Sequence, residues 1–263
     1  MNDINGLKLN ATALEGQGTS VPLSAIDIKI VKCWYQSFSE PWTGGVSYQR
    51  GKVLLPELLV NDDDLVRVDL EKKRNLLRVT DPKTGESRYE DVTGENEALT
   101  QTLQIHDADA LEPVDIPAGQ VRQFWVTVHV PDDAKAGAYK GIVSVTSEGS
   151  VVALPISLTV YPFDLARSIV EQAIFYRGKL QATDVPVIDK DKKTAVQYEA
   201  ELRNMLAHGV DTPLVYQPPQ GSARMDLMRR VLEMRKAAGV RTDRFFFCAW
   251  GIGPKDTDTD TRH

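Results

Sequence analysis

The sequence predicts a multidomain fold of β plus α/β class: an antiparallel β-sandwich followed by an incomplete (β/α) TIM-type barrel. Two observations lead to this fold class. Short alternating strands separated by turn residues fill the first part of the chain, and helix–glycine–strand units fill the second. We expect domains at 1–163 and 164–263, the second holding about three strands and two helices of a barrel.

The first domain is expected to consist of strands and turns. Val121–Val130 is rich in aromatic and β-branched residues, and Pro131–Gly137 interrupts it. Tyr139–Thr146 and Val151–Val160 then flank a turn at 147–150. Short alternating strands at this spacing are typical of an antiparallel sandwich. Earlier strands are expected at Ala25–Val31, Leu65–Leu70 and Leu76–Val79.

The second domain repeats a helix and a buried strand. Helices are expected over Tyr198–Ala207 and Met225–Ala238, ending at Gly209 and Gly239. Each glycine begins a Gly-Val-x-Thr segment that leads into a short apolar run, which suits the αβ loop of a parallel sheet covered on both faces. A three-stranded parallel sheet leaves an unpaired edge, so the chain is expected to be cut short. The predicted strands are Val170–Tyr176, Pro213–Tyr216 and Phe245–Ala249.

The composition excludes some partners. A net charge of −6 opposes nucleic acid, because phosphate binding needs clustered Lys and Arg. No apolar run approaches the roughly 20 residues that a membrane-spanning helix needs. The first residues lack a signal-peptide pattern. The localisation therefore stays open, and a longer parent protein is expected to be secreted or periplasmic. The sequence does not indicate the oligomeric state.

No metal or cofactor is predicted. The acidic run Asp62–Asp64 lacks the spacing and closing Glu of an EF-hand, which favours a solvated turn over calcium. The four histidines are scattered, and phosphate-binding, dinucleotide-binding and nucleophile-elbow motifs are absent. Cys33 and Cys248 lie in apolar runs, which favours two buried thiols over a disulfide.

Candidate substrate contacts lie where the predicted barrel strands end. Active sites of barrels are built at the carboxyl ends of the strands. Aromatic rings stack on sugar rings, and Arg and Gln side chains hydrogen-bond hydroxyls, so this mixture suits sugar binding. Two carboxyl groups for glycoside hydrolysis are not found there, so no catalytic residue is assigned. The candidates are Tyr176, Arg177, Tyr216, Gln217 and Trp250.

Several segments resemble a known family. Ile116–Gln120 and Phe124–Gly141 resemble the sandwich that precedes the catalytic barrel in glycoside hydrolase family 123 and its uncharacterised bacterial relatives. Val160–Leu165 is similar to the bridge into that barrel, and Trp34–Gln36 and Leu55–Asp62 resemble segments of the relatives. The resemblance implies a (β/α)8 hydrolase acting on glycans, amino-sugar-containing ones among them. It also implies that the sandwich begins before Met1.

The family's chemistry does not transfer to these residues. The resemblance implies substrate-assisted catalysis by an adjacent Asp–Glu pair deeper in the barrel, and this chain has no Asp-Glu dipeptide. The chain alone is therefore predicted to be inactive, a fragment of a glycosidase whose partner is a glycan or polysaccharide.

Two other functions remain open. A cluster of Trp34, Tyr35, Trp42 and Tyr48 is compatible with a non-catalytic carbohydrate-binding module, although such aromatics more often form a core. An immunoglobulin-like adhesion module explains the first domain but not the helix–strand repeat.

Overall fold

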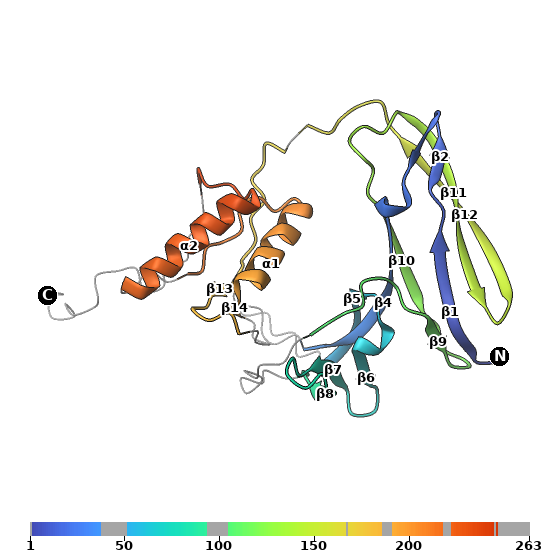
Figure 1. Ribbon diagram of the computed structural model, residues 1–263, viewed down its shortest axis with the longest axis horizontal. Helices are drawn as coiled ribbons and strands as arrows, with labels where there is room; N and C mark the ends of the chain where they lie inside the picture. The colour runs from blue at the N-terminus through green and yellow to red at the C-terminus, as the bar shows by residue number, and fades with distance from the viewer. Residues whose placement is uncertain are drawn as a thin grey trace, which may run out of the picture. The chain divides into compact units, whose positions relative to one another are not determined.

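The computed structural model describes residues 2–37, 52–93, 105–166, 168–185, 191–217, 222–244 and 246. The chain divides into two compact units. The first comprises Met1–Thr80, Gly85–Glu95 and Ile105–Leu165, and the second comprises Asp81–Thr84, Asn96–Gln104 and Ala166–His263. Strands build the described part of the first unit, and the helices α1 and α2 belong to the second (Figure 1).

Three antiparallel sheets make up the described part of the first unit. The largest has the order β3-β2-β11-β1-β9, with β12 paired to β11; the second has the order β10-β4-β5; the third has the order β6-β7-β8. Short 3-10 helices at Leu23–Ala25 and Asp63–Leu65 precede β4 and β6. The strands are β1 (Ile4–Ala11), β2 (Leu14–Gly16), β3 (Thr19–Val21), β4 (Ile26–Ser37), β5 (Lys52–Val60), β6 (Val66–Asp69), β7 (Arg74–Thr80), β8 (Ser87–Asp91), β9 (Val114–Ile116), β10 (Gln123–Val128), β11 (Gly137–Ser147) and β12 (Ser150–Val160).

The predicted turn at 147–150 closes the longest hairpin. Strands β11 and β12 pair from Gly137 opposite Val160 to Ser147 opposite Ser150. The two residues between them, Glu148 and Gly149, have φ values of 47° and 82°. Positive φ at both central positions is the mark of a type I′ turn, whose twist matches that of the flanking strands. The expected all-β character of this part of the chain is confirmed in each of its predicted strands.

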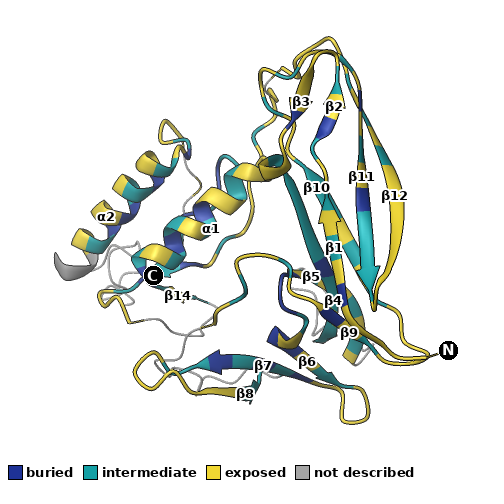
Figure 2. Cartoon of the chain, turned by 45° about the vertical axis from the view of Figure 1, so that its right-hand side comes forward, coloured by how far each residue is buried: buried dark blue, intermediate teal, exposed yellow. Residues whose placement is uncertain are grey.

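The core of the first unit lies between its first two sheets. Leu14, Val21 and Tyr139 have no exposed surface, and Ile26 and Val128 of the second sheet pack against them. The Tyr139 hydroxyl donates to the Lys135 carbonyl over 2.7 Å, which satisfies its polar end. This face-to-face burial makes the pair of sheets a sandwich. The outer strand β12 is exposed along most of its length (Figure 2).

Strands β4 and β5 are joined across a β-bulge beside Cys33. The register between β4 and β5 shifts so that Lys32 pairs with Leu58 but Cys33 pairs with Pro56, leaving Glu57 as an extra residue. An extra residue interrupts the alternation of faces along a strand pair. Cys33 is exposed, so its predicted burial is wrong: it follows the fully buried Ile30 by three residues and therefore lies on the opposite face of β4. Cys248 lies outside the described residues.

Both predicted helices of the second unit are confirmed. They are α1 (Ala195–Ala207) and α2 (Ser222–Ala238). Helix α1 starts with a capping box in which Thr194 and Gln197 exchange side-chain and backbone hydrogen bonds. The predicted stops, Gly209 and Gly239, have φ values of 81° and 89°, which only glycine adopts without strain. The buried core of this unit comprises Leu180, Tyr198, Leu202, Val215, Met228, Val231 and Val240.

The predicted strands of the second unit are not regular strands. Val170–Tyr176 has no assigned strand structure, and Pro213–Tyr216 holds a single bridge residue. Leu214 N–H donates to the Ile174 carbonyl over 3.0 Å and Thr212 N–H to the Gln172 carbonyl over 3.2 Å. These two bonds advance in the same direction along both segments, as in parallel pairing.

The first of these segments also lacks the burial that a strand of a parallel sheet normally has. Ile174 and Phe175 are 49% and 44% exposed, whereas apolar strands of a parallel sheet are normally covered on both faces. Of Phe245–Ala249 only Phe246 is described, and its carbonyl accepts from Val215 N–H over 2.8 Å. The regular parallel pair in this unit is β13 (Lys179–Leu180) with β14 (Lys192–Lys193). The barrel stays a prediction.

Candidate functional site

Two predicted contacts, Arg177 and Tyr216, meet in the second unit. The Arg177 guanidinium carbon lies 5.7 Å from the centre of the Tyr216 ring, and Lys179 Nζ lies 4.5 Å from it. Phe175 meets the same ring edge-on at 5.9 Å. Asp191 Oδ2 accepts from Arg177 Nη2 at 2.9 Å and lies 3.6 Å from Lys179 Nζ. We call Arg177, Lys179, Asp191 and Tyr216 the Tyr216 cluster.

Backbone hydrogen bonds hold the Tyr216 cluster in place. Lys179 N–H donates to the Asp191 carbonyl over 2.6 Å, which continues the β13–β14 pairing. The Gln217 amide oxygen accepts from Leu180 N–H over 2.8 Å, and its amide nitrogen donates to the Leu180 carbonyl over 3.4 Å. Gln217 is only 4% exposed. Its side chain is therefore engaged in linking β13 to the segment that carries Tyr216.

Tyr176 faces a different partner. Its hydroxyl donates to Glu201 Oε2 over 2.6 Å, and its ring lies 5.7 Å from that of Tyr198. Burial, followed by the Glu201 carboxylate, raises the pKa of Tyr176 well above its usual range. Glu201 also pairs with Lys193 Nζ at 2.9 Å. Tyr176 is thus a neutral hydrogen-bond donor that ties the end of its segment to helix α1.

Removing the Tyr176 hydroxyl has an expected pH signature. A raised folded-state pKa gives a contribution to stability that is complete below the unfolded pKa of about 10 and is lost as pH rises beyond it. We expect Tyr176→Phe to lower the free energy of unfolding by about 1 kcal/mol at pH 7, and this difference to shrink at pH 11. Urea denaturation at both pH values measures it. Tyr161→Phe, at a tyrosine 66% exposed, is the control, and a pH-independent difference for Tyr176→Phe contradicts the assignment.

The other predicted aromatic contacts provide little support for a sugar-binding surface. Trp250, Trp42 and Tyr48 lie outside the described residues. Trp34 is partly buried, and its indole N–H donates to Glu57 Oε2 over 2.7 Å, an oxygen that Gln36 Nε2 also contacts at 2.6 Å. The bulged residue Glu57 thus fixes the Trp34 ring on β4. Nothing in these contacts favours a separate carbohydrate-binding surface on this strand.

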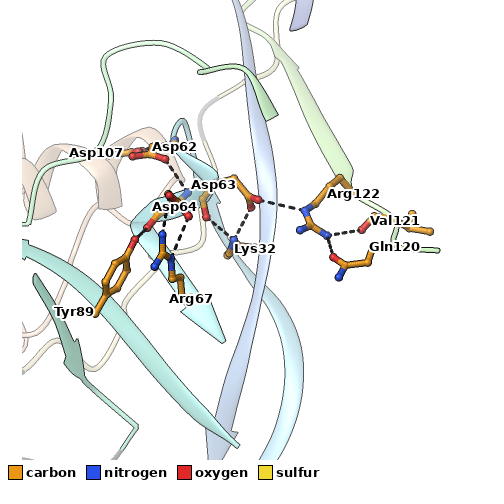
Figure 3. A network of polar contacts seen from close by, with 10 residues as sticks. All are labelled: Lys32, Asp62, Asp63, Asp64, Arg67, Tyr89, Asp107, Gln120, Val121 and Arg122. Atoms are coloured by element: carbon orange, nitrogen blue, oxygen red, sulfur yellow. Dashed lines mark hydrogen bonds and ion pairs between the residues drawn. The ribbon is translucent and has the colours of Figure 1, made fainter. Parts of the chain in front are cut away.

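The acidic run at 62–64 is a network of ion pairs (Figure 3). Asp63 contacts Lys32 at 2.5 Å and Arg122 at 3.3 Å, while Asp64 pairs with Arg67 at 3.0 Å. The hydrogen bond from Arg67 lowers the pKa of Asp64. These cations neutralise the carboxylates that a calcium ion would need.

Asp62 departs from the expected solvated turn. It is 6% exposed, pairs with Arg78 at 2.5 Å and accepts from Asp64 N–H over 2.7 Å. The interpretation as a solvated turn is therefore wrong for this residue. Within the described residues no group of three or more potential ligands is placed to hold a metal ion.

Sequence reasoning missed Lys179, Asp191 and Glu201. Asp191 and Lys179 lie 12 positions apart and meet through the parallel pairing of two two-residue strands, which leave no periodic pattern. Glu201 sits one turn after Tyr198 on the predicted helix, so it was placed correctly on α1 but without a partner. The charged residues in the loop after the first predicted strand could have pointed to this site, because barrel active sites are built from such loops.

Residues 79–147 match the glycoside hydrolase 123 N-terminal domain. The chain is similar to family 123 glycoside hydrolases. A solved structure of a family 123 glycoside hydrolase from Clostridium perfringens, described for glycolipid glycan hydrolysis, matches with a TM-score of 0.50 and 11% identity. The match covers 92% of this chain and 38% of that structure, so the chain spans well under half of it. No curated protein matches the sequence.

The family 123 resemblance is therefore carried by the sandwich sequence and by the fold. At 11% identity the structural match shows the fold alone. The matched residues 79–147 run from the end of β7 to the end of β11 and include β10 of the sandwich. In the part of the chain that is described, no helix is long and apolar enough to cross a membrane.

Proposed function

We propose that the chain is the sandwich and the first part of the barrel of a glycoside hydrolase acting on a glycan. The match of residues 79–147 to the glycoside hydrolase 123 N-terminal domain carries this proposal. The similar fold over 92% of the chain supports it. The sandwich then occupies 1–163, and 164–263 is the beginning of a (β/α) barrel whose catalytic carboxylates lie outside this chain.

The Tyr216 cluster contributes to substrate binding in this proposal. The Tyr216 ring offers an apolar face to a sugar, and Arg177 supplies hydrogen-bond donors beside it. Tyr176 and Gln217 act as positioning residues, because Glu201 and the Leu180 backbone engage their polar atoms. Trp250 is proposed as a further contact from its place in the sequence after the third predicted strand.

The described carboxylates near this cluster are engaged in ion pairs. Asp191 contacts two cations, and Glu201 accepts from Tyr176 and pairs with Lys193. Retaining and inverting glycosidases both place an acid and a second carboxylate on either side of the bond. The arrangement of Asp191 and Glu201 instead holds neighbouring side chains, which fits a role in binding.

Ligand-observed NMR with N-acetylgalactosamine tests the proposal. We expect weak binding by the full chain, with about tenfold loss for Tyr216→Ala, equivalent to about 1.4 kcal/mol. Tyr161→Ala, at an exposed tyrosine of the first unit, is the control and should bind as the unchanged chain does. An aryl glycoside assay is expected to show no turnover. Turnover that a single substitution in this chain abolishes, or the absence of any sugar binding, contradicts the proposal.

A further inference from the structure

The charges of the Tyr216 cluster do not balance. Its two cations, Arg177 and Lys179, share a single carboxylate oxygen, Oδ2 of Asp191, at 2.9 and 3.6 Å. Counted over its four described residues, the cluster therefore carries a net charge of +1. Both cations also lie over or beside the same ring, within 5.7 and 4.5 Å of its centre. Positive charge and an aromatic ring thus lie together in this cluster.

The cations are accessible and the carboxylate is covered. The side chains of Arg177 and Lys179 are 44% and 33% exposed, whereas that of Asp191 is 17% exposed. A guanidinium has five N–H donors and an ammonium has three, so among the described residues the shared Asp191 oxygen uses only part of these donors. A ligand approaching this cluster meets the donors before it meets Asp191.

Contacts that hold the cluster in place limit the conformational entropy lost when a ligand binds. Lys179 is fixed by its backbone bond to Asp191, and the next residue, Leu180, is fixed by Gln217. The edge-on contact of Phe175 supports the Tyr216 ring. Side chains already held near their binding positions lose less conformational freedom when a ligand arrives.

We propose that the sugar recognised at the Tyr216 cluster carries a carboxylate or a sulfate group. This inference rests on the proposed function and names the substrate class of the same site. The anionic group binds between Arg177 and Lys179 while the C–H face of the sugar ring contacts Tyr216. Charge-assisted hydrogen bonds from a guanidinium to such oxyanions are about twice as strong as neutral ones.

Calorimetry and ligand-observed NMR on the full chain test the charge preference. The probes are glucuronic acid, N-acetylgalactosamine 6-sulfate, neutral N-acetylgalactosamine and inorganic sulfate. We expect the two anionic sugars to bind about tenfold more tightly than the neutral sugar at low salt, equivalent to about 1.4 kcal/mol. The advantage should shrink as salt is raised, because the cations are partly exposed.

Variants separate a charge effect from a structural one. Arg177→Gln and Lys179→Gln should each weaken binding of the anionic sugars severalfold more than they weaken binding of the neutral sugar. Tyr216→Ala should weaken binding of all three sugars. Lys8→Gln, at an exposed lysine on β1, is the matched control and should change nothing.

The outcomes distinguish this inference from the proposed function. Equal binding of neutral and anionic sugars, unaffected by Arg177→Gln, overturns the charge preference and leaves glycan binding standing. Inorganic sulfate binding as tightly as the sulfated sugar, with no effect of Tyr216→Ala, overturns recognition of the sugar ring. Failure of every sugar to bind overturns both proposals.

Discussion

Replacing Asp62 with alanine is expected to lower the free energy of unfolding of the first unit by about 3 kcal/mol. The Asp62 carboxylate is 9% exposed and pairs with Arg78, whose side chain is 28% exposed. The same carboxylate accepts from Asp64 N–H at the start of the short helix Asp63–Leu65. The substitution leaves a partly buried guanidinium without its carboxylate and removes a helix cap, and both losses destabilise the folded state.

Asp64→Ala is the matched control for this substitution. Its carboxylate is 63% exposed and pairs with Arg67 three residues away, and exposed pairs of this kind contribute about 0–1 kcal/mol. Urea denaturation and hydrogen exchange over β6 and β7 measure both variants. Equal effects of the two substitutions would mean that burial of Asp62 does not decide the strength of its interactions.

Replacing Leu202 with alanine is expected to lower the stability of the second unit by about 3 kcal/mol. Leu202 is fully buried on α1, in a cluster with Val215 and Val231. Truncation removes contacts on every side of the leucine and leaves a cavity that helices α1 and α2 cannot fill by small shifts. The amides of both helices should then exchange about a hundredfold faster, while those of β10 and β11 keep their rates.

Val196→Ala on the same helix provides the control. Val196 is 79% exposed, and alanine has the higher helix propensity, so the change should stay within about 0.5 kcal/mol. Hydrogen exchange with mass spectrometry resolves the two units separately. Faster exchange in β10 and β11 of Leu202→Ala would show that the two units unfold together.

The parts of the fold set by local chemistry were predictable from the sequence. Gly209 and Gly239 end helices where expected, since a left-handed residue at that position strongly favours glycine. The turn at Glu148 and Gly149 was likewise expected between two alternating strands. Cys33 was misplaced because its apolar neighbours were weighed above the alternation of β4: Ile30 is fully buried, and Cys33, three residues later, lies on the opposite face.

The candidate site was predicted only in part. Arg177 and Tyr216 were found by their positions after apolar runs, and the structure brings them together. Gln217 was found by the same rule, but its amide is engaged by the Leu180 backbone, a contact between residues 37 positions apart. Lys179 and Asp191 depend on the path of a loop. A loop's path is decided by tertiary hydrogen bonds rather than by hydrophobic periodicity.

Strand β12 presents an outer edge of backbone groups that invites pairing with another chain, and Val151, Val152 and Leu154 are exposed along it. Proline 155 sits opposite Ile142, whose N–H and carbonyl bond Thr12 and so point away from β12. Pro155 therefore turns its own nitrogen outward, where it has no hydrogen to donate. A second molecule pairing along this edge would find no hydrogen-bond donor at Pro155, which interrupts a continuous backbone ladder there.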